Sequence, residues 1–166
     1  GVTSIPANAF YGYSSLKTVS LPSTLTSIGN DAFYGCSGLR DIDLSGIESI
    51  GSYAFQNCTG LTSIDLTSAT TIGEGAFRGC TGLTGVVVPQ GCSMGTAVFR
   101  DCTGITSATF GRRTSINTST FYGCTGLISV NLPDGLERIC SYAFRGCTNL
   151  ESIHLPDSIT TLDADA

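Results

Sequence analysis

The chain repeats one short phrase, a small residue and Phe followed by two spacer residues and then Cys, at intervals of 22 or 23 residues. A fixed period of this length is typical of solenoid proteins, in which each repeat forms one coil that stacks on its neighbours. We therefore expect a single array of about seven coils over residues 1–166, without an internal domain boundary. The full copies are Ala32–Cys36, Ala54–Cys58, Ala76–Cys80, Val98–Cys102, Thr120–Cys124 and Ala143–Cys147, and Ala9-Phe10, with Tyr13 in the Cys position, begins the series.

The composition narrows the classes of protein that remain. A hydrophobic fraction of 41% is sufficient for a core and disfavours intrinsic disorder. The net charge of -5 argues against a nucleic-acid partner. No stretch approaches the roughly 18 consecutive apolar residues of a membrane span, so direct membrane insertion is not expected.

Both ends of the chain fall inside a repeat. Gly1 lies part-way into a coil, and Ala166 occupies the small-residue position that precedes Phe in the other repeats. Solenoids need polar caps over their terminal coils. We therefore expect a fragment of a longer chain that lacks its own caps, or an array whose ends are covered by partners.

One coil illustrates the predicted local structure. Thr62–Leu66 alternates polar and apolar residues, which predicts a short strand with Ile64 and Leu66 inward and one such strand in each coil. A second apolar position follows, and in four coils Gly comes directly after it, where we expect a backbone conformation that favours Gly. The segment from there to the Phe is predicted to be a helical turn or a short 3₁₀ piece on the outer wall. The Phe side chains are predicted to form a stack of seven rings. The four glycines are Gly29, Gly51, Gly73 and Gly95.

A family resemblance rests on residues 16–39, which read LKTVSLPSTLTSIGNDAFYGCSGL. The combined Leu, Ile, Gly, Phe and Cys positions resemble the BspA-like class of leucine-rich repeats, and the resemblance extends over essentially the whole chain. It implies a leucine-rich-repeat solenoid with stacked short parallel strands on one face and short helical or 3₁₀ turns and loops on the other. It also implies a binding module, since members of this class are surface proteins that attach to host matrix, host cells or other microbes. The local departures are Asn117 and Cys140 in place of Gly, and Phe110–Arg113 where Leu-Pro and an apolar residue are expected.

The eight cysteines have a structural interpretation. Six of them occupy one repeat position and are predicted to form a ladder of buried free thiols that act as small hydrophobic groups. Cys92 and Cys140 fall in other positions about two coils apart, too far to pair. No spacing of Cys and His matches a zinc site. We therefore expect no metal and no cofactor.

The main candidate for a binding surface is the column two positions before the repeated Cys, which holds Tyr or Arg in every repeat except one, where it holds Gln56. These residue types are over-represented at the energetic centres of protein interfaces. The alternative is that the Tyr rings cover apolar seams and the Arg stems lie over their neighbours. We call this column the Tyr/Arg stripe; its members are Tyr11, Tyr34, Arg78, Arg100, Tyr122 and Arg145, with Tyr53 and Tyr142 on the same outer region.

A weaker candidate lies on the predicted strand face. Asp41, Asp43 and Asp65 form an acidic cluster there, which could contact a basic ligand or hold Ca²⁺ weakly, although solvated strand positions are the default interpretation. His154, the one histidine, lies in the same column but has no Ser or Cys partner at repeat-compatible positions. A catalytic role is therefore not expected.

These observations favour a non-enzymatic interaction module with a protein partner of unknown identity. By resemblance, it is the adhesion or ligand-binding repeat region of a cell-surface or secreted protein. The alternative is a scaffold subunit packed within a larger assembly, in an intracellular or organellar compartment that keeps thiols reduced.

Overall fold

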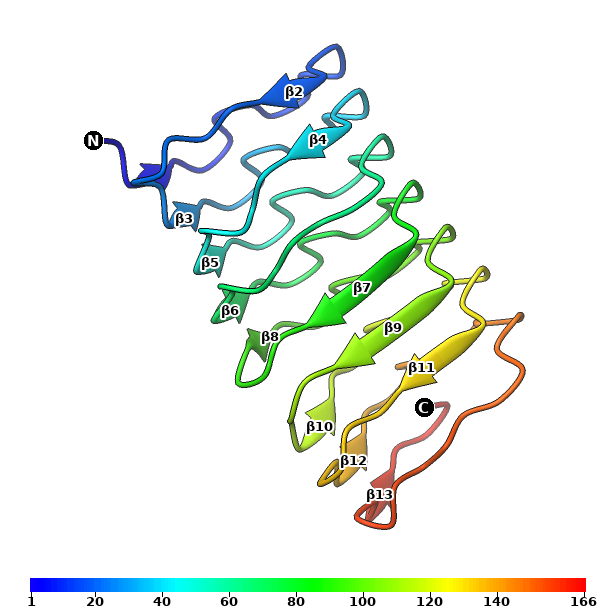
Figure 1. Cartoon of the computed structure of the whole chain (residues 1–166). Coiled ribbons are helices and arrows are strands. Elements are labelled where there is room, and N and C mark those ends of the chain that lie inside the picture. Colours follow the sequence, from blue (N-terminus) through cyan, green and yellow to red (C-terminus); the bar gives the residue numbers. More distant parts are fainter.

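The computed structural model describes residues 1–166 and forms one continuous stack of coils, with the two termini at opposite ends (Figure 1). We number the coils by their Phe residue, from coil 1 with Phe10 to coil 7 with Phe144. Most coils contribute two short strands, which form two rows along the stack. The first row contains β2 (Thr18–Val19), β4 (Asp41–Ile42), β7 (Gly85–Val88), β9 (Ser107–Phe110) and β11 (Ser129–Asn131). The second row contains β1 (Ser4–Ile5), β3 (Ser27–Ile28), β5 (Ser49–Ile50), β6 (Thr71–Ile72), β8 (Ser93–Met94), β10 (Ser115–Ile116), β12 (Arg138–Ile139) and β13 (Thr161–Leu162).

The second row of strands is a feature that the sequence-based expectation of one strand per coil missed. Its pairing is parallel and advances by one coil at a time, as in Ser27 with Ser49 and Ile28 with Ile50. The Ile side chains are buried while the Ser side chains lie nearer the surface. A β-branched residue beside a small polar one suits a half-buried strand, so the pattern was present in the sequence.

The first row is interrupted in coil 4, where the predicted strand Thr62–Leu66 was wrong. Its residues have no strand assignment, and Ser63, Ile64 and Asp65 make no backbone–backbone hydrogen bond. The Asp65 carboxylate accepts a hydrogen bond from the N–H of Thr67, 2.9 Å away, and so begins a turn. Asp43 lies at the corresponding position of coil 3, and two like charges at neighbouring positions disfavour strand pairing.

The outer wall contains turns and no helix, so the prediction of helical or 3₁₀ pieces is corrected. Residues with positive φ recur along it, such as Tyr53 (58°) and Asn57 (60°) in coil 3, and they prevent helical continuation. The N–H groups of Tyr53, Phe55 and Asn57 donate to carbonyls of the next coil, each over 2.8 Å. The wall is therefore held by hydrogen bonds between coils. With no helix present, none is available that could span a membrane.

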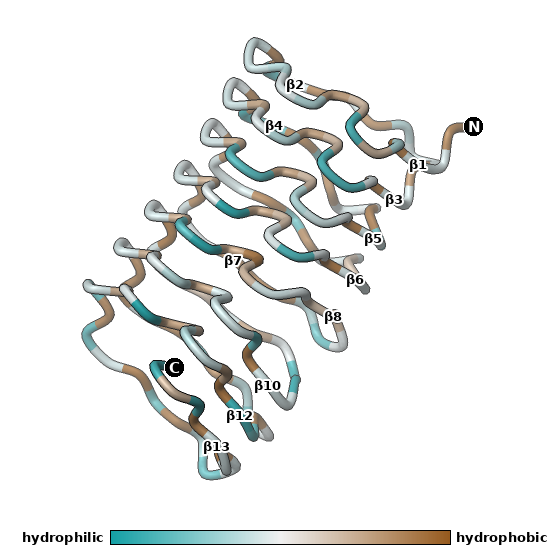
Figure 2. Tube along the Cα trace, turned by 180° about the vertical axis from the view of Figure 1, so that it is seen from behind, coloured by the Kyte–Doolittle hydropathy of each residue, from teal (hydrophilic) through white to brown (hydrophobic).

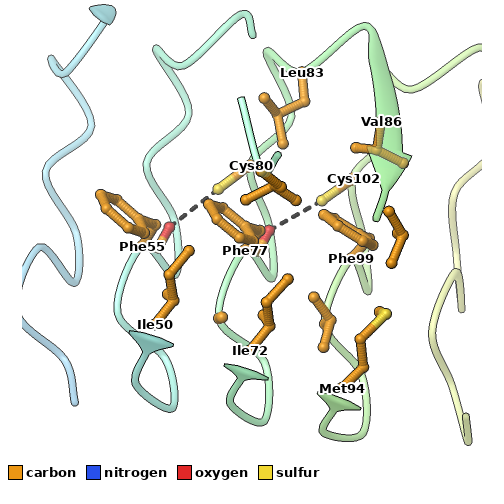
Figure 3. Packing of buried hydrophobic residues seen from close by; sticks show 14 of the residues in the cluster. Ile50, Phe55, Ile72, Phe77, Cys80, Leu83, Val86, Met94, Phe99 and Cys102 are labelled. Atoms are coloured by element: carbon orange, nitrogen blue, oxygen red, sulfur yellow. Dashed lines mark hydrogen bonds between the residues drawn. The ribbon is translucent and has the colours of Figure 1, made fainter. Parts of the chain in front are cut away.

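The core contains the expected stack of seven Phe rings. Neighbouring ring centroids lie 5.1–5.8 Å apart with interplanar angles of 1–14°. The second row of strands contributes a column of apolar side chains beneath the rings, as Ile50, Ile72 and Met94 show in Figure 3. Figure 2 shows that apolar residues recur at matching places in successive coils. The stack is therefore one continuous core.

The cysteine ladder runs beside the rings, and all eight cysteines are free. Each ladder thiol donates a hydrogen bond to the Phe carbonyl of the preceding coil. The distance is 3.0 Å from Cys80 Sγ to the Phe55 oxygen and from Cys102 Sγ to the Phe77 oxygen (Figure 3). The thiols are thus both packing groups and hydrogen-bond donors, which satisfies a polar S–H inside the core.

Gly is required after the second apolar position for a different reason from the one expected. Gly29, Gly51, Gly73 and Gly95 do not adopt positive φ. At Gly29 an added Cβ would lie 2.6 Å from the backbone nitrogen of Ala7 in the preceding coil. Gly is required there because two backbones approach closely, and backbone cannot move aside as a flexible side chain can.

The same reasoning predicts the effect of Gly82→Ala. The new Cβ would lie 2.5 Å from the Thr59 oxygen and 2.6 Å from the Leu61 oxygen. We expect the free energy of unfolding to fall by about 1–3 kcal/mol, because the coils must separate locally. Gly46→Ala is the matched control, since its nearest neighbour is 4.0 Å away; its stability should be unchanged or raised by up to about 1 kcal/mol. Urea unfolding measures both, and equal losses would contradict the close-approach explanation.

Candidate functional site

The Tyr/Arg stripe lies on the outer wall, one residue after each inward-facing Phe. Phe33 is fully buried, whereas the following Tyr34 is partly exposed. At the N-terminal end of the stripe, the rings of Tyr11 and Tyr34 are parallel, 3° apart in orientation, with centroids separated by 4.7 Å. These two rings form an aromatic platform that belongs to coils 1 and 2.

The middle of the stripe is a charged cluster. Arg78 Nε and Arg100 Nε lie 3.5 Å and 3.3 Å from the same Asp101 carboxylate oxygen. The Arg100 guanidinium carbon also lies 4.4 Å from the ring centroid of Tyr122, a cation–π contact. The side chains of Arg78 and Arg100 remain 38% and 34% exposed, so this arrangement orients them without covering them.

The C-terminal part of the stripe repeats this arrangement in coil 7. Arg145 Nη1 lies 3.3 Å from the Asp165 carboxylate, and its guanidinium carbon lies 5.3 Å from the Tyr142 ring centroid. Tyr53 behaves differently. Its ring packs against Gly75 of the next coil and occupies the space that a Cβ on Gly75 would need. A hydrogen bond with Glu74 raises the pKa of the Tyr53 hydroxyl. Tyr53 is therefore a packing residue of the outer wall.

Asp101 and Asp165 are members of this surface that sequence reasoning missed. Asp101 occupies the position before Cys and has a positive φ of 60°. Gly fills that position in other coils, as Gly79 and Gly123 do. A charged residue in a place that favours Gly is a signal that could have been noticed.

The strand-face candidates are not brought into one site. Asp43 and Asp65 each accept a hydrogen bond from the backbone two residues ahead, and the bond from Ser45 lowers the pKa of Asp43. Asp41 lies in β4, in register with Thr18 of β2. His154 comes four coils after Asp65, roughly 19 Å along the stack at ordinary strand spacing. No group of three or more metal-ligating side chains occurs in the structure.

One groove of about 330 Å³ lies on the strand face between coils 4 and 5. It follows the interrupted segment of coil 4 and the beginning of β7, and its lining includes Ile64, Asp65 and Val87. Val87 is 66% exposed, which is unusual in a column of otherwise polar residues. The groove combines apolar contact with one carboxylate and contains no nucleophile–base pair.

The repeat pattern of the chain matches a known protein family. The sequence model of the BspA type leucine-rich repeat region matches residues 3–126 and 114–166 in 6 copies. The chain belongs to the BspA-type leucine-rich repeat family. No curated protein sequence matches this BspA-type chain.

Solved structures place the BspA-type chain among bacterial leucine-rich repeat proteins. It is similar to one from Bacteroides ovatus, with 32% identity and a TM-score of 0.89 over 98% of this chain and 43% of that one. It is similar to the T. pallidum leucine-rich repeat protein, with 35% identity and a TM-score of 0.83 over 90% of this chain and 72% of that one. A Eubacterium ventriosum protein shares the fold at 22% identity and a TM-score of 0.66, over 90% of this chain and 57% of that one.

The prediction of a leucine-rich-repeat solenoid is confirmed for this BspA-type protein. The chain spans less than half of the Bacteroides ovatus protein, so it corresponds to a part of that relative. Leucine-rich repeats generally mediate protein binding, and the family and fold are typically non-enzymatic.

Proposed function

We propose that the chain is the ligand-binding repeat region of a surface or secreted adhesin-like protein, and that the Tyr/Arg stripe contacts a protein partner. The observation that carries this proposal is the fixed, partly exposed cluster of Arg78, Arg100 and Tyr122 around Asp101. The general role of leucine-rich repeats in protein binding supports it.

The cluster has the properties of an energetic centre. Tyr and Arg contribute disproportionately to binding when a partner excludes water from them. Asp101 and the Tyr122 ring already restrict Arg78 and Arg100, so less side-chain entropy is lost on association. Exposed ion pairs of this kind contribute little to stability, which leaves them available for binding.

The test is the triple variant Arg78→Ala, Arg100→Ala and Tyr122→Ala. Binding of the chain to purified extracellular-matrix proteins and to intact epithelial cells is measured by biolayer interferometry and flow cytometry. We expect affinity to fall by more than about tenfold, because at least two hot-spot residues are removed. The melting temperature should change little, since all three side chains are partly exposed.

The matched control is Lys17→Ala with Arg40→Ala, which removes two exposed basic residues near the first row of strands. This double variant should bind like the unmodified chain. If the triple variant binds every probe as tightly as the unmodified chain does, the stripe is not the contact surface.

The free thiols favour a second candidate, a scaffold subunit in a compartment that keeps cysteines reduced. This role requires no binding to matrix proteins or cells. Absence of binding by the unmodified chain, together with co-purification in a defined assembly, would favour the scaffold over the adhesin.

A further inference from the structure

The turn after β9 differs from the other turns and interrupts the second row of strands. Together with Phe110, the last residue of β9, it reads Phe110-Gly111-Arg112-Arg113. The second row pairs continuously from β1 to β8 and again from β10 to β13, but β8 and β10 do not pair. A basic turn therefore lies at the one break in this row.

The Arg113 guanidinium fills the break. Its Nε–H donates to the Ser115 carbonyl over 2.9 Å, and Nη2 donates to the Cys92 carbonyl over 3.3 Å. Nη1 donates to the sulfur of Met94 over 3.0 Å, and the Phe110 ring centroid lies 5.3 Å from the guanidinium carbon. These contacts use three of the five N–H groups of an arginine. One N–H on each terminal nitrogen is left without a protein acceptor.

Neither arginine of this turn forms an ion pair within the chain. Arg78, Arg100, Arg138 and Arg145 each pair with an aspartate. Neither Arg112 nor Arg113 has a carboxylate within 4.0 Å, although Arg113 is half-buried and burial lowers its pKa. A half-buried guanidinium that has free N–H donors and no counter-ion binds an external anion strongly.

A crevice of about 440 Å³ opens beside these arginines, between the turns of coils 6 and 7. Its lining comprises Arg112, Arg113, Thr114, Asp134 and Gly135. Gly135 has a positive φ of 84° and nothing within 4 Å of the place where a Cβ would project. The crevice therefore contains two arginines, the Thr114 hydroxyl and the Asp134 carboxylate. Its wall at Gly135 is not obstructed by other atoms.

We propose that this crevice binds a single carboxylate group of an acidic peptide segment, in contact with Arg112 and Arg113. The planar guanidinium matches a carboxylate with two parallel N–H···O bonds. Asp134 on the other wall disfavours a densely charged polyanion and can accept a hydrogen bond from an N–H next to the bound carboxylate. The site lies at the turn edge and does not depend on the Tyr/Arg stripe.

The experiment is an NMR titration of the ¹⁵N-labelled chain with three probes at constant ionic strength. The probes are glutamate blocked at both backbone ends, its blocked glutamine analogue, and inorganic sulfate. We expect saturable shifts of the Arg112, Arg113 and Thr114 signals with blocked glutamate, with a dissociation constant on the order of 10 mM or tighter. The glutamine analogue and sulfate should bind at least about fivefold more weakly, because neither offers a single carboxylate.

Three substitutions test the assignment. Arg112→Gln should weaken binding of blocked glutamate by at least about fivefold, and Asp134→Asn should strengthen it by about twofold to threefold. Arg40→Gln, an exposed arginine elsewhere on the chain, should have no effect. Arg113 is left intact because its contacts join coils 5 and 6. The proposal is overturned by the absence of shifts with blocked glutamate, by equal or tighter binding of sulfate, or by equal losses in Arg112→Gln and Arg40→Gln.

Discussion

Replacing Phe77 by Ala is expected to lower the free energy of unfolding by about 3–5 kcal/mol. Phe77 is fully buried, and its ring stacks between those of Phe55 and Phe99 at centroid distances of 5.3 Å and 5.7 Å. Removal of the ring takes away contacts with both neighbours and leaves a cavity that rigid coils cannot collapse into. Urea unfolding followed by circular dichroism measures the loss.

Phe10→Ala provides the comparison for this prediction. Phe10 is partly exposed and stacks on one Phe ring only, that of Phe33 at 5.1 Å. Its loss should cost less than half as much as the loss of Phe77, because less apolar area returns to water and no closed cavity forms. Equal costs at the two positions would show that the continuous stack is not what makes Phe77 important.

The second large effect is a loss of stability at alkaline pH caused by the cysteine ladder. Burial raises the pKa of Cys58 and Cys102 to about 12 and that of Cys147 to about 11, against 9.0 for a thiol exposed to water. The folded chain therefore holds these protons more tightly than the unfolded chain. The stabilisation is fully present below about pH 8 and is lost as pH rises towards 12. Each thiol should contribute up to about 1.4 kcal/mol of destabilisation per pH unit in that window.

Unfolding in urea between pH 8 and pH 11, with a reducing agent present, measures this dependence. The variant Cys58→Ala should show a shallower loss with pH, smaller by about one proton in slope. Its stability at pH 8 should be lower because a buried sulfur is removed. A stability that does not change between pH 8 and pH 11 would contradict the prediction for the ladder as a whole.

The core of the fold could be predicted because it depends on one position per coil. Phe33 and Phe55 occupy equivalent positions 22 residues apart, so stacking coils brings equivalent side chains together without further information. The same reasoning placed Cys58 and Cys80 in one buried ladder. Residues that recur at the period of the repeat therefore stack as a column of side chains along the solenoid.

The outer wall could not be predicted in the same way. Its turns depend on positive φ at Asp31, Tyr53, Ala97 and Ser119. None of these is Gly, and only Gly75 at the equivalent place in coil 4 indicates the conformation. Hydrogen bonds to the next coil stabilise this backbone, so tertiary context decides it rather than local propensity.

The candidate surfaces were predicted only in part, for a related reason. The Tyr/Arg stripe follows from the period, but the pairing of Arg78 and Arg100 with Asp101 depends on side-chain geometry between coils. The contacts of Arg113 with Cys92 and Met94 likewise join coils whose residues lie 19 to 21 positions apart. Asp101 and the turn Phe110–Arg113 both depart from the repeat in the sequence. These departures do not show which residues the side chains contact.

The interruptions of the two strand rows have a mechanical consequence. The first row of strands is absent in coil 4, but there the second row is continuous because β6 pairs with β5 and β8. The second row is broken between coils 5 and 6, but there the first row is continuous because β7 pairs with β9. Bonds of the outer wall, such as that from the Phe99 N–H to the Thr120 carbonyl, join coils throughout. A force that pulls on the two ends of the stack therefore meets backbone hydrogen bonds at every junction, and no junction resists extension by side-chain packing alone.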